Sequence, residues 1–246
     1  MCDNKRFFIC LLFFCLLFTH HAGAQDFLIA PQSRMLEESY PVKLYYDALG
    51  ENAHLYNGYE YPTPNWIIKG SPYWVDSMTR SNLYYDECFY QNVPILYDMV
   101  LDLVVIDRLD QHFKISLISS KLLSFSLKNH EFVRINKDSL KGVDIPTGFY
   151  DWIYKGKSTI LAKRIKTVQE VIEYNKANQY YIDNNLYFVK SGGRFVEVGN
   201  KTALLKLFAS KKSEIKKYIR KNKLDFNSDF EKTLIAICAY YDQLTS

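Results

Sequence analysis

The stretch Leu123–Ile135, with the sequence LSFSLKNHEFVRI, carries the clearest structural pattern of the chain. Apolar and polar residues alternate up to Leu127, the polar residues Asn129 and His130 interrupt the pattern, and an apolar run begins at Phe132. Alternation of this kind is typical of strands that bury one face, and a polar break between two such runs indicates a turn. The stretch therefore predicts an antiparallel hairpin with one face against a core.

Short strands and turns of the same kind are expected on both sides of this hairpin. The Asn57-Gly58 pair inside the string HLYNGYEY suits the positive φ angles of a tight hairpin turn. Further turns are predicted at Asp86-Glu87, Lys155-Gly156-Lys157 and Gly192-Gly193. The segment Thr167–Asn178 follows neither pattern, and we interpret it as helical or irregular. The succession of strand-like runs and turns thus predicts an antiparallel β-rich region over residues 42–199.

Helical spacing replaces alternation after Gly199. In the last helical stretch Ser228 is a suitable N-cap, with Glu231 three residues later. Apolar residues then fall on one face, which we expect to belong to the core: Phe230, Leu234, Ile237, Cys238 and Tyr241. The predicted fold is α+β and mainly antiparallel β, as a meander, a roll or a partly closed barrel. The helical segment 200–246 is expected to pack on the β-rich region and to form one domain with it.

The first 24 residues have the pattern of a secretory signal peptide. A basic start precedes the apolar run Phe7–Phe18, and small residues end at Ala24. The run is too short for a transmembrane helix, which needs about 20 apolar residues, and no cysteine in it follows a small residue, as a lipoprotein signal would require. We therefore expect cleavage between Ala24 and Gln25 and an extended lead-in over 25–41. The product is expected to be soluble and periplasmic or secreted, with no further membrane span.

Charge is distributed unevenly along the remaining chain. Residues 25–150 contain 11 basic and 16 acidic residues, whereas residues 151–246 contain 18 and 10. Nine basic residues and one acidic residue lie between Lys201 and Lys223. An exported protein meets no nucleic acid, so the candidate partners are lipid head groups, a phosphorylated envelope glycan or an acidic protein surface, either on another envelope protein or on the N-terminal half of this chain. A solvated helix face is the alternative. The binding candidates in this cluster are Lys211, Lys212, Lys216 and Lys217.

Aromatic residues are abundant outside the expected signal peptide, where all 20 tyrosines lie. Flat rings on one face of a sheet suit stacking on sugars or contact with proteins, and they equally suit cross-strand packing. Trp66 and Trp74 lie in a loop punctuated by prolines, and we take them as further binding candidates.

Motifs for catalysis or metal binding are absent from the sequence. There is no H-E-x-x-H, C-x-x-C or G-x-S-x-G string, and the histidines after the leader, His54, His112 and His130, are far apart. Cys88 and Cys238 are expected to be separate buried thiols rather than a disulfide. The sequence therefore predicts no catalytic residue, no metal site and no cofactor, and it favours a role other than that of an enzyme.

Five strings of the sequence occur in a distinctive order. They are LYNGYEY (Leu55–Tyr61), NVPILYD (Asn92–Asp98), GFYDWIYKGK (Gly148–Lys157), KKSEIKKYIRKNKLDF (Lys211–Phe226) and AYYDQL (Ala239–Leu244). Together they resemble an uncharacterised family of exported proteins in Bacteroidota. The resemblance covers nearly the whole chain after the leader. It implies an envelope location and a single architectural unit, and it implies no activity and no site residue.

A non-catalytic envelope protein is the leading functional hypothesis, with binding or scaffolding through an aromatic sheet face or the basic helix. Two alternatives remain open. The first is an exported hydrolase of glycan or peptide, with carboxylates and His112 or His130 assembled in space. The second is a carrier of a small apolar ligand inside a closed set of strands.

Overall fold

The structure is a computed structural model, and it describes residues 54–108, 113–137 and 145–245. All of these belong to one compact unit, Met35–Ser246. The expected signal peptide with its Ala24–Gln25 cleavage site, the lead-in over 25–41, and His112 lie outside the described residues.

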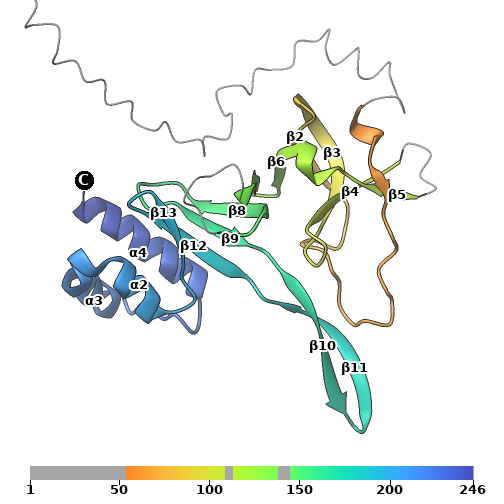
Figure 1. The fold of residues 1–246 in the computed structure, drawn as a ribbon. Coiled ribbons are helices and arrows are strands. Elements are labelled where there is room, and N and C mark those ends of the chain that lie inside the picture. The colour runs from red at the N-terminus through yellow and green to blue at the C-terminus, as the bar shows by residue number, and fades with distance from the viewer. Residues whose placement is uncertain (1–53, 109–112, 138–144, 246) are drawn as a thin grey trace, which may run out of the picture. The chain divides into compact units, whose positions relative to one another are not determined.

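Eleven strands form one antiparallel sheet in the order β1-β5-β4-β3-β2-β6-β7-β8-β9-β12-β13, and β10 and β11 form a separate two-stranded ribbon (Figure 1). The strands are β1 Tyr59–Glu60, β2 Thr79–Tyr85, β3 Cys88–Asp98, β4 Leu103–Asp107, β5 Lys114–Ser116, β6 Leu122–Leu127, β7 His130–Ile135, β8 Gly148–Tyr154, β9 Ile160–Lys163, β10 Lys166–Glu173, β11 Lys176–Asp183, β12 Leu186–Ser191 and β13 Arg194–Glu197. The helices are α2 Lys201–Leu207, α3 Lys212–Lys221 and α4 Phe230–Leu244, with 3₁₀ turns η3 His54–Tyr56, η4 Ser119–Lys121 and η6 Ala209–Lys211.

The hairpin predicted from Leu123–Ile135 is confirmed as β6 and β7. Phe125 lies opposite Phe132, and their rings stack with centroids 4.7 Å apart. Lys128 occupies the turn with a φ of 55°. The alternation predicted this hairpin correctly because Phe125, Leu127 and Phe132 lie buried on one of its faces, although Leu123 at the start of that face is 47% exposed.

The sheet curls around an aromatic core. Tyr97 in β3 makes ring contacts with Phe125 and Phe132, and also with Phe149 in β8, which is four strands further along the sheet order. Such a contact between distant strands requires a strongly curved sheet. Tyr97 and the three phenylalanines are almost completely buried, so packed side chains occupy the space that the curved strands enclose.

The C-terminal helices form a second core with β9 and β12. Ile160 and Val189 of the sheet pack with Leu234 and Ile237 of α4, and the ring of Phe208 stacks on Tyr241. Of the predicted apolar stripe of α4, Leu234, Ile237 and Cys238 are buried, and Phe230 and Tyr241 are partly buried against the same core. The N-cap of α4 is Asp229 rather than the predicted Ser228, because the Asp229 carboxylate accepts a hydrogen bond from the backbone of Lys232 at 3.0 Å.

Two predicted local structures are wrong. Asn57 and Gly58 do not turn a hairpin, because β1 pairs with β5 instead of with a neighbouring segment. The segment Thr167–Asn178 is not helical, since it forms most of the ribbon β10–β11 with all eight residue pairs in register. The turns at Asp86-Glu87, Lys155-Gly156-Lys157 and Gly192-Gly193 are confirmed.

The predicted fold class is confirmed as α+β, mainly antiparallel β, with helices at the C-terminal end. Cys88 in β3 and Cys238 in α4 are separate thiols as expected; Cys238 is buried, whereas Cys88, which was also expected to be buried, is only half-buried. None of the helices in the described ranges is long and apolar enough to cross a bilayer.

Candidate functional site

The basic cluster of the sequence lies on the helices that follow the sheet (Figure 1). Ile215 and Ile219 of α3 are buried in the helical core, and the ring of Tyr218 stacks on Tyr240 of α4 with centroids 4.0 Å apart. These contacts fix the orientation of α3. Because the apolar residues recur at helical spacing on one side, the lysines are left on the outward side.

Nine basic residues form what we call the basic helical surface: Lys201, Lys206, Lys211, Lys212, Lys216, Lys217, Arg220, Lys221 and Lys223. Lys211 is half-buried and the other eight are exposed. The four lysines predicted as binding candidates all belong to this surface.

Like charges face one another along α3. Lys212, Lys216 and Arg220 follow at intervals of four residues, a spacing at which equal charges destabilise a helix by about 0.2–0.5 kcal/mol per pair. No carboxylate of the described residues forms an ion pair with any member of the basic helical surface. Interaction with the helix dipole favours only Arg220 and Lys221, in the last turn. Most of this charge therefore does not stabilise the helix that carries it.

The two tryptophan candidates lie in different environments. Trp66 is 89% exposed at a turn in which the Asn65 side chain accepts a hydrogen bond from the backbone of Ile67. Trp74 is half-buried, and its ring lies 5.2 Å from His130 and 4.9 Å from the Arg164 guanidinium. Of the two tryptophans, only Trp66 therefore has a ring exposed for binding. Trp66 is not part of the basic helical surface.

A buried charge cluster that the sequence did not reveal surrounds Arg164. This side chain is 4% exposed, and its guanidinium donates hydrogen bonds to Asp151 in β8 and to Glu231 in α4. Tyr187 in β12 also donates to Glu231, at 3.1 Å. Burial alone would lower the pKa of Arg164, but the hydrogen bonds and charges of Glu231 and Asp151 raise it. The cluster joins the sheet to α4, so its first role is structural.

His130 forms a histidine–carboxylate pair at the edge of this cluster. Its Nδ1 lies 2.8 Å from Asp151 Oδ2, and the ring is partly exposed. The hydrogen bond and charge of Asp151 raise the pKa of His130 above its ordinary value of 6.5. A general base needs a neutral imidazole, and among the described hydroxyl groups none is hydrogen-bonded to His130. Among the described residues, the pair therefore has no hydroxyl nucleophile hydrogen-bonded to it.

We expect the stability of the protein to fall as pH rises through the pKa of His130. Because the folded-state pKa is raised, the stabilisation from protonated His130 is complete below about pH 6.5 and is lost at higher pH. Partial exposure limits this contribution to about 1 kcal/mol or less. Urea unfolding between pH 5.5 and 8.5 measures it, and His130→Gln should remove this part of the slope. An unchanged slope in the variant would contradict the assignment.

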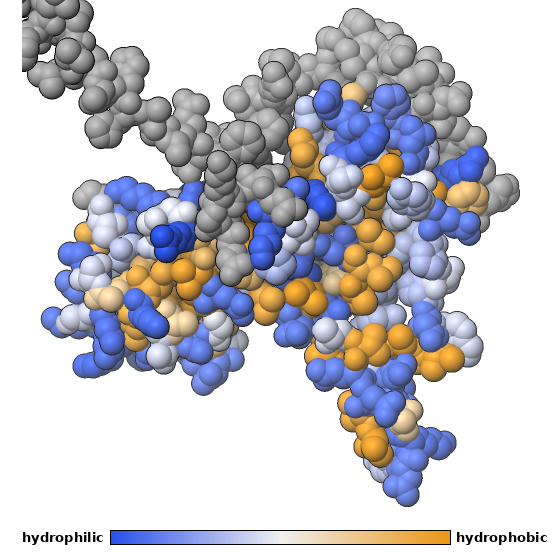
Figure 2. All heavy atoms as spheres, viewed as in Figure 1, coloured by the Kyte–Doolittle hydropathy of each residue, from blue (hydrophilic) through white to orange (hydrophobic). Residues whose placement is uncertain are grey.

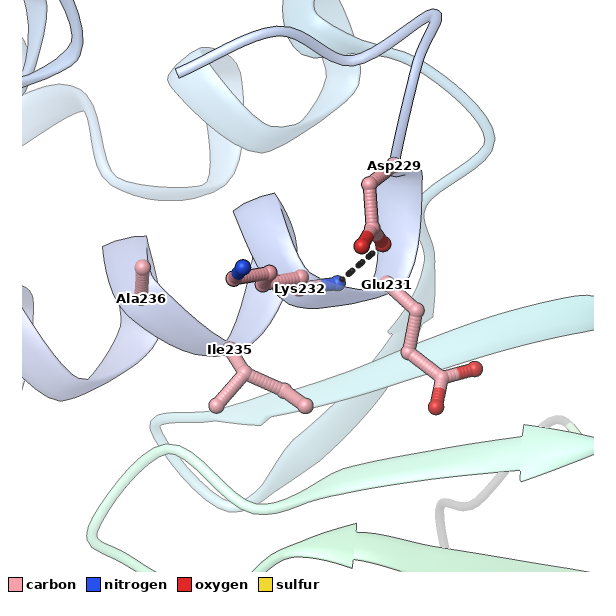
Figure 3. Close-up of a pocket in the computed structure, with 5 residues that line it drawn as sticks. All are labelled: Asp229, Glu231, Lys232, Ile235 and Ala236. Atoms are coloured by element: carbon pink, nitrogen blue, oxygen red, sulfur yellow. Dashed lines mark hydrogen bonds between the residues drawn. The ribbon is translucent and has the colours of Figure 1, made fainter. Parts of the chain in front are cut away.

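Surface depressions of the described structure are open. One of them, with a volume of about 550 Å³, lies beside the first turns of α4, and all its lining residues belong to that helix or its cap: Asp229, Glu231, Lys232, Ile235 and Ala236. Figure 3 shows the carboxylate of Glu231 directed away from the Asp229 cap. A ligand there would contact one helix face only, so the depression does not enclose a substrate.

A second depression, of about 290 Å³, lies over β2, β6 and β7 and is bordered by His130 and Glu131. Across the described ranges, no group of three histidine, cysteine or carboxylate side chains is placed to hold a metal ion. Ser126, which also borders this depression, uses its hydroxyl as an acceptor for the backbone of Asn82. The second depression thus combines polar side chains without a nucleophile positioned beside a base.

Protein-family models, curated proteins and solved structures give no match to this chain. Its function must therefore be inferred from its own geometry. The feature with the least structural explanation is the basic helical surface, because its charges are exposed, repel one another and have no partner among the described carboxylates.

Proposed function

We propose that this chain is a non-catalytic protein of the cell envelope that binds anionic lipid head groups through the basic helical surface. The observation that carries the proposal is the uncompensated charge of α3, whose like-charged side chains repel each other until an anionic surface neutralises them. The expected signal peptide and the resemblance to exported proteins support an envelope location, periplasmic or secreted.

The composition of the surface favours head groups over a single bound anion. Eight of its nine basic residues are lysines and only Arg220 is an arginine. Lysine acts as a mobile point charge, whereas arginine provides the planar fork suited to one carboxylate or phosphate in a fixed position. Each lysine close to an anionic membrane contributes about 1 kcal/mol of binding free energy. A rigid helix that displays several lysines fits a layer of phosphates.

The proposal is tested by co-sedimentation with vesicles of phosphatidylcholine, with or without one third phosphatidylglycerol. We expect binding only to the anionic vesicles, with loss of binding as salt rises from about 0.05 M to about 0.5 M. Lys216→Gln combined with Lys217→Gln should weaken binding about 30-fold, from the loss of about 1 kcal/mol per lysine.

The matched control is Lys128→Gln combined with Lys176→Gln. It removes two exposed lysines outside the helices and gives the same net charge. Binding that depended on net charge alone would weaken equally in both double variants, and the proposed surface would then be wrong. Salt-independent binding, or equal binding to vesicles without phosphatidylglycerol, would also count against it.

A further inference from the structure

The ribbon β10–β11 is unusually exposed for a regular two-stranded structure. Its strands close through a two-residue turn at Tyr174 and Asn175, which have φ angles of 49° and 60°, as a type I′ hairpin requires. Six of the eight residues of β10 are exposed, and Figure 2 shows hydrophobic residues along the ribbon. A two-stranded hairpin is only marginally stable in water, so additional contacts would stabilise it.

The two edges of the ribbon differ in their backbone pairing. On the edge of β11, the backbone N–H of Lys69 donates to the carbonyl of Gln179 at 2.8 Å, and the N–H of Tyr181 donates to the carbonyl of Lys69 at 3.0 Å. The loop that carries Lys69 therefore covers this edge near its middle.

Beyond Lys166, no described segment forms backbone hydrogen bonds with the outer edge of β10. The backbone N–H of Lys166 points away from β11, because it donates to the carbonyl of Met99 at 3.1 Å. Backbone groups of alternate residues point to the same side of a strand, so those of Val168, Glu170 and Ile172 also face outward. No strand within the described ranges pairs with this edge, and β10 contains neither a proline nor a bulge that would block pairing.

The side chains at this edge indicate what could pair with it. Val168, Glu170 and Ile172 lie on one face of the ribbon, because successive side chains alternate. Val168 and Ile172 are 40% and 75% exposed, and they flank the exposed carboxylate of Glu170. A second copy of β10, paired antiparallel with Val168 opposite Ile172, would place the two Glu170 carboxylates opposite each other, which is unfavourable.

We propose that the outer edge of β10 binds an extended peptide segment in which a lysine or arginine lies opposite Glu170, with apolar residues at the alternate positions on both sides. Backbone hydrogen bonds to the edge would provide affinity, and the basic residue would provide selectivity through Glu170. This interface is separate from the basic helical surface, so vesicle binding and peptide binding can fail independently.

The probe is a blocked, fluorescently labelled peptide, Thr-Val-Thr-Lys-Thr-Val-Thr, titrated with the full chain and followed by anisotropy. We expect it to bind about fivefold more tightly than the same peptide with glutamate in place of lysine. Glu170→Lys should reverse this preference. Gln169→Lys places the same lysine side chain on the opposite face of the same strand, with a charge change of +1 rather than +2, and it should leave the preference unchanged. N-methylation of the peptide amides that face β10 should abolish binding.

Several results would overturn the proposal. One is failure of the lysine peptide to bind while circular dichroism shows a folded chain, and another is equal affinity for both peptides. Reversal of the preference by Gln169→Lys as well as by Glu170→Lys would show that net charge decides. If sedimentation equilibrium shows that Glu170→Gln converts the chain to dimers, and the peptide does not compete with dimer formation, the occupant of this edge is a second copy of the chain.

Discussion

Replacement of Arg164 by alanine is expected to lower the free energy of unfolding by about 3–5 kcal/mol. Arg164 and Asp151 are 4% and 1% exposed, so the substitution would leave the Asp151 carboxylate buried without its main cation. Asp151 Oδ1 already has no hydrogen-bond partner in the described structure, which makes the carboxylate more dependent on the contacts of Oδ2. The Glu231 carboxylate would also lose the contact that ties α4 to the sheet.

Urea unfolding followed by circular dichroism and tryptophan fluorescence measures this effect. Arg164→Lys should lose less stability than Arg164→Ala, because lysine retains the charge but cannot bond to two carboxylates as a planar fork. Arg164→Met combined with Asp151→Leu should recover much of the loss, since no buried charge then remains unpaired.

The control for this prediction is Lys114→Ala, which breaks the exposed ion pair with Asp107. An exposed pair contributes about 0–1 kcal/mol. If Arg164→Ala were no more destabilising than Lys114→Ala, the cluster would not be the tie between sheet and helix that its geometry indicates.

Elements with a buried face could be predicted from the sequence. The hairpin β6–β7 and the helix α4 each bury one side, so the sequence shows a period of 2 in the first and of 3.6 in the second. The ribbon β10–β11 buries neither face fully, and its apolar residues therefore show no period. The interpretation of Thr167–Asn178 as helical or irregular failed for this reason.

The role of Gly58 shows a second limit of structure prediction from the sequence. A Cβ at this position would lie 2.2 Å from the backbone oxygen of Ser116, so the glycine allows β5 to approach closely. Glycine occurs both in tight turns and where two backbone segments approach closely. The neighbouring Asn57 favoured the prediction of a turn, which was wrong. Only the pairing of β1 with β5, which are more than 50 residues apart in the chain, distinguishes the two.

The two candidate sites also differ in how far apart their residues lie in the sequence. The basic helical surface is local in sequence and was found by counting charges between Lys201 and Lys223. The cluster around Arg164 was not found, because Asp151 and Glu231 are 13 and 67 residues away in the chain. No local spacing could associate these residues, since a curved sheet and a terminal helix bring them together.

Replacement of Asp102 by alanine is expected to lower the free energy of unfolding by about 2–4 kcal/mol. Its carboxylate accepts hydrogen bonds from the hydroxyl of Tyr97 at 2.7 Å, from Lys163 Nζ at 2.8 Å and from the backbone of Phe149 at 3.2 Å. Burial and the nearby Asp102 raise the pKa of Tyr97 well above its usual value, so its hydroxyl remains a donor that needs an acceptor. Gly148 is fitted to this contact, since a Cβ there would lie 2.3 Å from Asp102 Oδ2.

A graded series separates the backbone contribution of Asp102 from that of its carboxylate. Asp102 has a φ of 56°, a conformation that strains most residues but not glycine, and that asparagine tolerates. Thermal unfolding should therefore give the stability order wild type, Asp102→Asn, Asp102→Gly, Asp102→Ala. Tyr97→Phe should recover part of the loss in the Asp102→Ala background, because it removes the hydroxyl left without an acceptor. Equal stability of the glycine and alanine variants would show that backbone strain at this turn is negligible. If Tyr97→Phe recovered no stability, the Tyr97 hydroxyl would have found another acceptor.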